Sequence, residues 1–176
     1  MKKMICAFLL LISVGINAQK LIFTDETTEV KFTTTHGLAR LQGSFKGVEG
    51  TAGFNPQQLQ NSFIRLSFQT NTVTTSDNYM GPSLIKTECF DIANHPTIEL
   101  ASSSITARGK NQYQFRGTLK IRGISRQVVF PFTAEANVGG YDMNFSFPVM
   151  RRHFNLNCNF MSKDLRFSIR AYAKKA

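Results

Sequence analysis

The sequence contains no tryptophan, and only three of its 176 residues are cysteine and three are histidine. It has no C-x-x-C pair and no Cys/His spacing typical of zinc sites, so we expect no metal site. It also shows no G-X-Y period and no sustained heptad, and only one long apolar run occurs. These absences exclude collagen-like, coiled-coil and multi-span membrane proteins.

What the chain does contain is apolar surface. Hydrophobic residues make up 42% of the sequence, 16 residues are Phe, and only 18% are charged. Disordered chains carry far less apolar surface than this. The length suits one domain with a proper core, and we find no internal repeat or linker that would separate a second domain.

Residues 1–18 have the pattern of a secretory signal peptide. Two lysines precede an apolar stretch, Met4–Ile16, which is short for a membrane span, and Ala18 offers a small residue at the cleavage point. A retained membrane anchor is the alternative. We therefore predict that cleavage near Ala18 leaves residues 19–176 as one exported domain, periplasmic or secreted.

The charge is strongly basic, with 21 Lys and Arg against 11 Asp and Glu. An exported protein rarely meets nucleic acid, so we expect no nucleic-acid partner. Anionic lipid headgroups, phosphates or acidic polymers are the partners that this charge favours. The alternative is that the charge only keeps a Phe-rich protein soluble.

Two cysteines, Cys89 and Cys158, remain after the predicted cleavage. An exported protein can form a disulfide, and an even count allows one. Sequence alone does not place their Cα atoms within bridging distance, so the pairing stays open at this point.

Alternation of apolar and polar residues dominates the chain after residue 18. In Gln112–Arg122 the odd positions are apolar or Gly and the even positions are polar, which is typical of an antiparallel strand with one buried face. The same pattern recurs in Ile64–Gln69, Tyr141–Val149 and Leu165–Arg170. Shorter strand candidates are Glu29–Thr35, Arg40–Val48, Gly50–Phe54, Pro96–Ser104 and Gln127–Val138.

Eight or nine strands without a long helical period indicate an all-β sandwich or barrel. We expect helix only in short pieces near Gln57–Asn61 and Ser76–Glu88. Two stretches, Ser76–Asp91 and Met150–Asp164, break the alternation. Long connections in compact β domains often cover or gate a cavity.

Several short motifs resemble those of one known family. They are Phe32-x-x-x-His36, Gly43-x-Phe45, Thr75 through Leu84 to Phe90-Asp91, His95-Pro96-x-Ile98, Gly117-Thr118-Leu119-Lys120-Ile121-Arg122-Gly123 and Arg151-Arg152-His153-Phe154-Asn155-Leu156. With them the chain resembles the YceI-like polyisoprenoid-binding proteins, which are exported lipocalin-like barrels. The resemblance extends from about Phe32 to Ile169.

The resemblance implies a single antiparallel β-barrel of about eight strands whose lumen holds an isoprenoid or another long apolar chain, for storage or transport. No cofactor is expected beyond a bound isoprenoid lipid or quinone. The alternative is a non-catalytic structural or stress-related interaction domain with a filled barrel core. The candidate lumen residues are Phe32, His36, Phe45, Phe68, Phe90, Tyr113, Phe115, Phe130, Phe132, Phe145, Phe147 and Phe154.

No motif in the chain is specific for catalysis. There is no G-x-S-x-G, and the eleven acids are scattered rather than paired. His36 and His95 suit hydrogen-bonding positions at strand ends. We therefore predict a protein without enzymatic activity and without catalytic residues.

Basic residues gather on one predicted strand. Arg116, Lys120 and Arg122 share the polar parity of Gln112–Arg122 and should form an outward stripe. One interpretation is a solvated face that discourages edge pairing. The other is transient docking on an anionic membrane surface, where the barrel would collect or deliver a lipid.

Overall fold

The computed structural model describes residues 19–36, 38–76, 81–158 and 164–176, without the side chain of His36. The predicted signal peptide at 1–18 lies outside this range. In the described part nine strands occur, and the helices are short. The strands are β1 (Lys20–Thr24), β2 (Thr28–His36), β3 (Ala39–Gly53), β4 (Phe63–Thr75), β5 (Thr97–Gly109), β6 (Gln112–Ile121), β7 (Ile124–Asn137), β8 (Gly140–Met150) and β9 (Asp164–Lys175).

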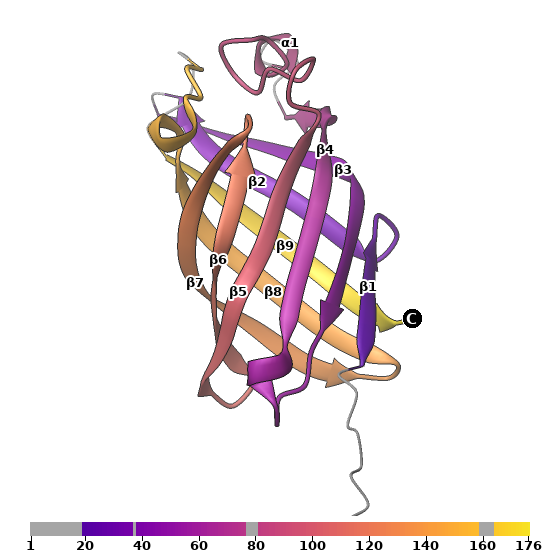
Figure 1. Ribbon diagram of the computed structural model, residues 1–176. Coiled ribbons are helices and arrows are strands. Elements are labelled where there is room, and N and C mark those ends of the chain that lie inside the picture. Colours follow the sequence, from indigo (N-terminus) through magenta and orange to yellow (C-terminus); the bar gives the residue numbers. More distant parts are fainter. Residues whose placement is uncertain (1–18, 37, 77–80, 159–163) are drawn as a thin grey trace, which may run out of the picture.

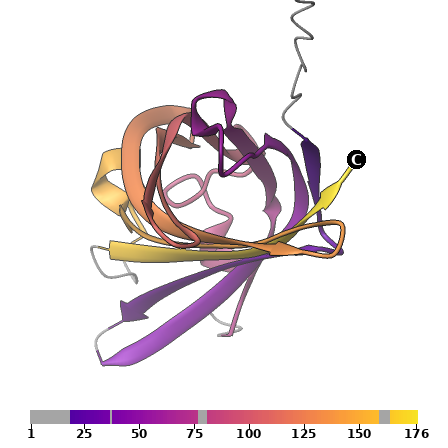
Figure 2. The ribbon, with the colours of Figure 1, turned by 90° about the horizontal axis from the view of Figure 1, so that it is seen from below.

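Strands β2 to β9 form a closed, eight-stranded antiparallel barrel, as predicted (Figure 1). Neighbours in sequence pair with each other, and β9 returns to pair with β2 and so closes the ring. β1 lies between the ends of β3 and β9 and pairs with both. Viewed from below, the strands form a ring, from which one end of the β2–β3 hairpin projects to the side (Figure 2).

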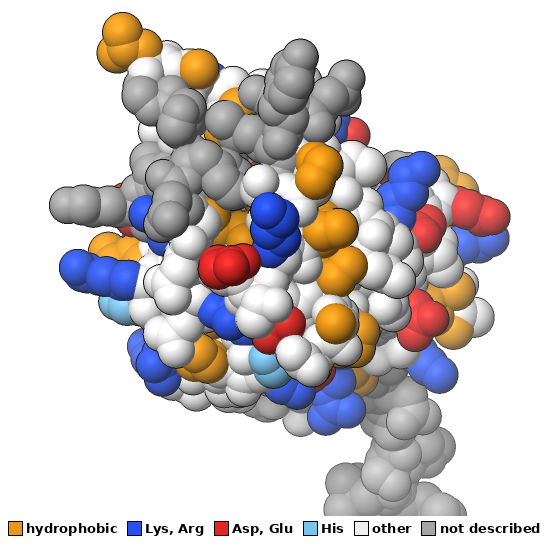
Figure 3. Space-filling view, turned by 90° about the horizontal axis from the view of Figure 1, so that it is seen from above, with side chains coloured by type: hydrophobic (Ala, Val, Ile, Leu, Met, Phe, Trp, Pro, Cys, Tyr) orange, Lys and Arg blue, Asp and Glu red, His pale blue; other side chains and the backbone are white. Residues whose placement is uncertain are grey.

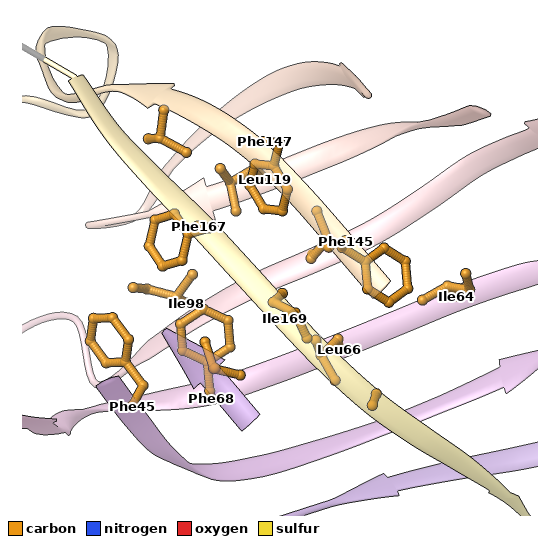
Figure 4. Packing of buried hydrophobic residues seen from close by; sticks show 14 of the residues in the cluster. Phe45, Ile64, Leu66, Phe68, Ile98, Leu119, Phe145, Phe147, Phe167 and Ile169 are labelled. Atoms are coloured by element: carbon orange, nitrogen blue, oxygen red, sulfur yellow. The ribbon is translucent and has the colours of Figure 1, made fainter. Parts of the chain in front are cut away.

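The alternation predicted from sequence sets the two faces of the barrel. Along β6, Tyr113, Phe115, Leu119 and Ile121 are buried, whereas Arg116 between them is exposed. The apolar side chains on alternate positions of β3, β4, β8 and β9 point into the same interior (Figure 4). The core of the protein is therefore the inside of the barrel.

One strand prediction was wrong. Arg40–Val48 and Gly50–Phe54 were predicted as separate strands, but the structure has a single strand, β3. The pairing of β3 with β4 shifts register twice around Lys46. Gly47 there has φ 67°, and Asp25 accepts its backbone N–H at 2.8 Å. Gly47 thus forms a β-bulge, which bends the strand without ending it.

Gly117, in the most specific of the family-like motifs, is required by close strand packing. A Cβ atom at this position would lie 2.1 Å from the backbone oxygen of Ala101 on β5 and 2.7 Å from the Phe115 ring. Any side chain would therefore push β5 and β6 apart. The motif's first glycine lets two strands and an interior ring pack against one another.

In the described part of the chain, three short helices lie between strands. η1 (Leu59–Asn61) joins β3 to β4, while α1 (Gly81–Leu84) and η2 (Arg151–Phe154) belong to the two irregular segments predicted from sequence. Figure 1 shows α1 and η2 at the same end of the barrel. These two segments, residues 81–96 and 151–158, form what we call the cap. Both predicted helical pieces, near Gln57–Asn61 and within Ser76–Glu88, are confirmed, but the expectation that helix occurs only there was wrong, because η2 lies outside them.

Candidate functional site

The barrel interior is lined by aromatic rings. The eleven aromatic side chains predicted for the lumen are all buried, with exposed fractions between 0 and 5%. His36, the twelfth candidate, is the last residue of β2, and its side chain lies outside the described residues. The structure thus brings the aromatic candidates into one interior. Their contact with a ligand stays a prediction.

Four rings follow one another across neighbouring strands. Phe115 on β6 stacks on Phe130 on β7, with ring centroids 4.7 Å apart, and Phe130 stacks on Phe147 on β8 at 4.2 Å. Phe147 in turn stacks on Phe167 on β9 at 5.8 Å. This ladder gives one wall of the interior a continuous aromatic surface, which apolar chains contact favourably.

Other contacts cross the interior. Phe68 on β4 lies 6.0 Å from Phe167 on β9, although β3 and β2 separate these strands in the ring. Phe45 contacts both rings, at 5.2 Å and 6.1 Å. Phe90 reaches in from the cap and meets Phe45 edge-on at 5.5 Å. The rings near the cap therefore touch across the barrel.

The opposite end of the barrel is closed by Phe54, directly after β3. Its ring meets Tyr113 on β6 and Tyr141 on β8, each at 5.0 Å, and Phe132 on β7 at 6.3 Å. Burial raises the pKa of the Tyr113 phenol above its usual value of 10.0, and the neighbouring Tyr141 raises this pKa further. The interior is thus aromatic from Phe54 at one end to Phe90 at the other.

Sequence reasoning missed three of these rings. Phe167 lies on the apolar parity of β9, so the alternation could have identified it. Tyr141 is also on an apolar parity position, at the start of β8. Phe54 ended the predicted strand Gly50–Phe54 on the parity of Ala52, but only the closure of the barrel brings its ring to β6 and β8.

A disulfide joins the two cap segments. Cys89 and Cys158 are bonded, with Cα atoms 4.8 Å apart, and both side chains are buried. Beside the disulfide, the backbone N–H of Asn157 donates to the carbonyl oxygen of Glu88 at 2.7 Å. The pairing that the sequence left open is therefore present, and it makes the cap one unit.

Arg122 holds this cap on the barrel. It lies in the turn after β6 with φ 50°, and its guanidinium donates to the carbonyl oxygens of Thr87, at 2.9 Å, and Asn155. Its side chain is only 15% exposed. The prediction that Arg122 belongs to an outward basic stripe was therefore wrong. The strand ends at Ile121, and the turn directs Arg122 over the cap.

The other two residues of the predicted basic stripe, Arg116 and Lys120, form a less positive surface than expected. Lys120 contacts the carboxylate of Glu99 on β5 at 3.0 Å, which neutralises much of its charge. Arg116 remains exposed. Viewed from the cap end, acidic and basic side chains are interspersed (Figure 3).

Asp91, behind Phe90, is the buried acid of the cap. Its carboxylate accepts a hydrogen bond from Asn94 at 3.0 Å and lies 3.8 Å from His95 and 3.9 Å from Arg122. Its backbone has φ 51°. This cluster orients the cap loop. Among the described residues, no group of three or more His, Cys, Asp or Glu could hold a metal ion.

The structure thus combines a barrel with aromatic rings in its interior, the Gly117–Gly123 motif on β6 and its turn, and a cap held by Arg122. The sequence model of the YceI-like domain matches residues 23–173. The chain belongs to the YceI-like family. In this YceI-like chain the matched region includes β2 to β8, most of β9 and both cap segments.

Curated YceI-like relatives are distant. A UPF0312 protein of Azotobacter vinelandii is 24% identical over 121 residues, which are 66% of this chain and 63% of the relative. Protein YceI of Salmonella arizonae is 27% identical over 112 residues, 63% of this chain and 56% of the relative. The chain thus spans less than two-thirds of the length of these relatives.

Solved structures share the YceI-like fold. BcnA of Burkholderia cenocepacia superposes with a TM-score of 0.78 at 19% identity, over 84% of this chain and 96% of that one. A polyisoprenoid binding domain from Saccharophagus degradans, implicated in plant cell wall breakdown, gives 0.70 at 10% identity over 91% and 99%. At these identities the likeness concerns the fold alone.

One of the family-like motifs builds the cap end of the site. The Arg151–Leu156 segment forms η2, buries Phe154, and lets Arg151 donate to the carbonyl oxygens of Leu156 and Cys158. Within the described ranges, no helix is long and apolar enough to cross a membrane.

Proposed function

We propose that this YceI-like protein binds an isoprenoid or a similar long apolar chain, such as a quinone tail, in its barrel and stores or carries it. The observation that carries the proposal is the apolar interior with clusters of aromatic rings at both ends, around Phe54 and around Phe90. The fold likeness to a polyisoprenoid binding domain supports it. The role is binding rather than catalysis.

Burial of the chain supplies the affinity. Each CH₂ group transferred from water to an apolar interior contributes about 0.8 kcal/mol, so a prenyl chain of a few units binds tightly without polar contacts. Phe45, Phe68 and Phe167 now touch across the interior. A chain that passes this level displaces one of these rings, and the displaced ring then packs against the ligand.

The same proposal places the protein outside the cytoplasm, at an anionic membrane where lipid is exchanged. The leader-like residues 1–18 support export, as does the Cys89–Cys158 disulfide, because disulfides persist in oxidising compartments. The basic excess of the chain supports attraction to anionic headgroups.

A second candidate function is a structural or stress-related interaction domain whose barrel stays filled by its own side chains. The specific observation that favours it is the contact between Phe68 and Phe167 across the interior. In this case the aromatic rings stabilise the fold and bind no ligand.

Organic extraction of the protein purified from its native host, followed by mass spectrometry, distinguishes the two. Lipid binding predicts a co-purifying prenyl lipid or quinone near one molecule per barrel. Stripped protein should also bind a dansylated geranylgeranyl chain, with a rise in dansyl fluorescence. No extractable lipid together with no fluorescence change would favour the filled barrel.

A further inference from the structure

The barrel is split between β7 and β8 over its cap half. Their pairing covers Phe132 to Asn137 and Gly140 to Phe145 and ends at the Phe132–Phe145 pair. Beyond it, β7 stays paired with β6 as far as Ile124, and β8 stays paired with β9 as far as Met150. We call this unpaired stretch, residues 124–131 of β7 and 146–150 of β8, the seam.

Two prolines explain why the ladder stops. The N–H of Ala134 bonds to Asn111 on the β6 side, so by alternation the backbone of Pro131 faces β8. The N–H of Lys175 bonds to Gly139 on the β9 side, so the backbone of Pro148 faces β7. Continued pairing would oppose Pro131 to Ser146 and Pro148 to Val129. Both prolines lack the N–H that such pairing needs.

The burial pattern changes at the same point. From Phe130 to Ala134 the interior parity of β7 is buried, but Val128 on that parity is only half-buried and Arg126 is exposed. β7 bows along the edge of the molecule in Figure 1. The interior side of β7 therefore becomes accessible where β8 no longer covers it.

Four of the seven outward positions of the seam are apolar, whereas outward positions elsewhere on these strands are mostly polar. Val129 is 51% exposed and Met150 44% exposed, and Pro131 and Pro148 are exposed as well. A slot of about 220 Å³ lies here. It is lined by surface residues such as Val129 and Met150 and also by Phe130 and Phe147 from the interior. It therefore extends from the surface to the stacked rings of the lumen wall.

Arginines border this apolar strip on both sides. Arg116 pairs in register with Val129, and Arg166 pairs with Pro148. Arg126 and Arg152 are exposed at the cap end, and Asp164, the register partner of Met150, is the acid beside them. Apolar residues flanked by cations complement the interface of an anionic bilayer, where arginines meet phosphates and apolar side chains enter the acyl region.

An added protein strand fits the seam less well. A strand that pairs with β7 or β8 needs donors and acceptors along the edge, and Pro131 and Pro148 each remove a donor that faces the seam. The slot is lined mainly by apolar side chains, such as Val129, Phe130 and Phe147, with Arg126, Gln127 and His153 among them. The apolar side chains suit a hydrocarbon chain.

We propose that the seam rests on an anionic membrane and is the entrance through which a lipid chain passes sideways into the lumen, between Phe130 and Phe147. Their stacked rings, 4.2 Å apart, close the path until one of them rotates. This inference rests on the proposed function, and it adds the route and the surface that the lipid uses.

The test uses a Val129→Asp, Met150→Asp double variant. Both side chains are exposed, so the barrel should fold, and two negative charges on the seam oppose anionic headgroups. The matched control is Val138→Asp, an exposed valine in the β7–β8 turn away from the seam. Transfer of dansylated geranylgeranyl chain is followed from vesicles of equal phosphatidylglycerol and phosphatidylcholine. Equilibrium binding of the same probe is measured without vesicles.

We expect transfer to the double variant to be about tenfold slower or more, because each added negative charge weakens the surface attraction by roughly fivefold. Equilibrium binding should stay within about twofold, and Val138→Asp should match wild type in both measurements. Normal transfer by the double variant would overturn the seam as entrance and leave lipid binding intact. Absence of equilibrium binding in the wild type would overturn the proposed function itself, and the seam proposal with it.

Discussion

Arg122, in the turn after β6, donates a hydrogen bond to the carbonyl oxygen of Asn155, 33 residues further along the chain. The same guanidinium bonds to Thr87, so it contacts both cap segments that the disulfide joins. The disulfide therefore joins the two cap segments to each other, and Arg122 holds them on the barrel by hydrogen bonds. We expect loss of Arg122 and loss of the disulfide to affect the protein differently.

Replacement of Arg122 by Met should loosen the cap without opening the barrel. The buried guanidinium loses hydrogen bonds to two carbonyl oxygens, so we expect the free energy of unfolding to fall by about 2 kcal/mol. Hydrogen exchange should accelerate at residues 86–91 and 155–158. The exposed Arg116→Met variant is the control and should stay within about 0.5 kcal/mol of wild type. Equal effects of the two variants would show that Arg122 does not hold the cap.

Loss of the disulfide should lower stability by a larger amount. Cys89 and Cys158 are 69 residues apart. Closing a loop of this length lowers the conformational entropy of the unfolded chain, which adds roughly 4 kcal/mol to the free energy of unfolding. A Cys89→Ala, Cys158→Ala variant should therefore unfold at clearly lower urea concentration while its circular dichroism stays that of a β protein. Reductant should destabilise wild type and leave the variant unchanged. Identical urea midpoints for the two proteins would contradict the expectation.

The alternation of side chains explains why the strands could be predicted and the connections could not. Gln112–Arg122 was predicted almost as β6 occurs, because each residue on one parity is buried by the same interior. Arg122 was assigned outward because alternation gives no information on where a strand turns. β3 was predicted as two strands, Arg40–Val48 and Gly50–Phe54, because glycine at positive φ, as at Gly47, occurs both in turns and in bulges.

Contacts between residues far apart in the chain were less predictable from the sequence. Nothing near Cys89 in sequence indicates that a cap segment 69 residues away lies beside it. The seam did leave a trace, since Val129 and Pro131, and likewise Pro148 and Met150, are apolar on outward parity. That trace becomes interpretable only when β7 and β8 are known to be neighbours and their register is fixed.

The interior rings should differ sharply from a surface ring in their effect on stability. Phe115→Ala removes a fully buried ring that stacks on Phe130, so we expect a loss of about 3–5 kcal/mol in the free energy of unfolding. Phe63→Ala, at an exposed position, should cost less than about 1 kcal/mol. Urea titration of both variants measures the difference. Similar costs would mean that Phe115 is not packed as described.

The buried Tyr113 should make the protein lose stability at high pH. Its pKa in the folded state lies above the ordinary 10.0 of the unfolded chain, so the unfolded state releases this proton first. The contribution is complete below pH 10 and is lost as pH rises through the folded pKa. In a pH titration followed by phenolate absorbance, one tyrosine should ionise at higher pH than the others, and this step should be absent in Tyr113→Phe. Unfolding of that variant should also depend less steeply on alkaline pH.

The seam predicts a break in backbone protection within single strands. By alternation, the amides of Gln127 and Val129 face across the seam, whereas those of Thr133 and Asn144 face the same neighbouring strand where the ladder is formed. We expect Gln127 and Val129 to exchange hydrogen roughly a hundredfold faster than Thr133 and Asn144, because only the latter pair has partners that must open first. Residue-resolved NMR exchange provides the measurement. Equal protection of all four amides would mean that β7 and β8 are zipped along their whole length, which leaves no lateral route to the lumen.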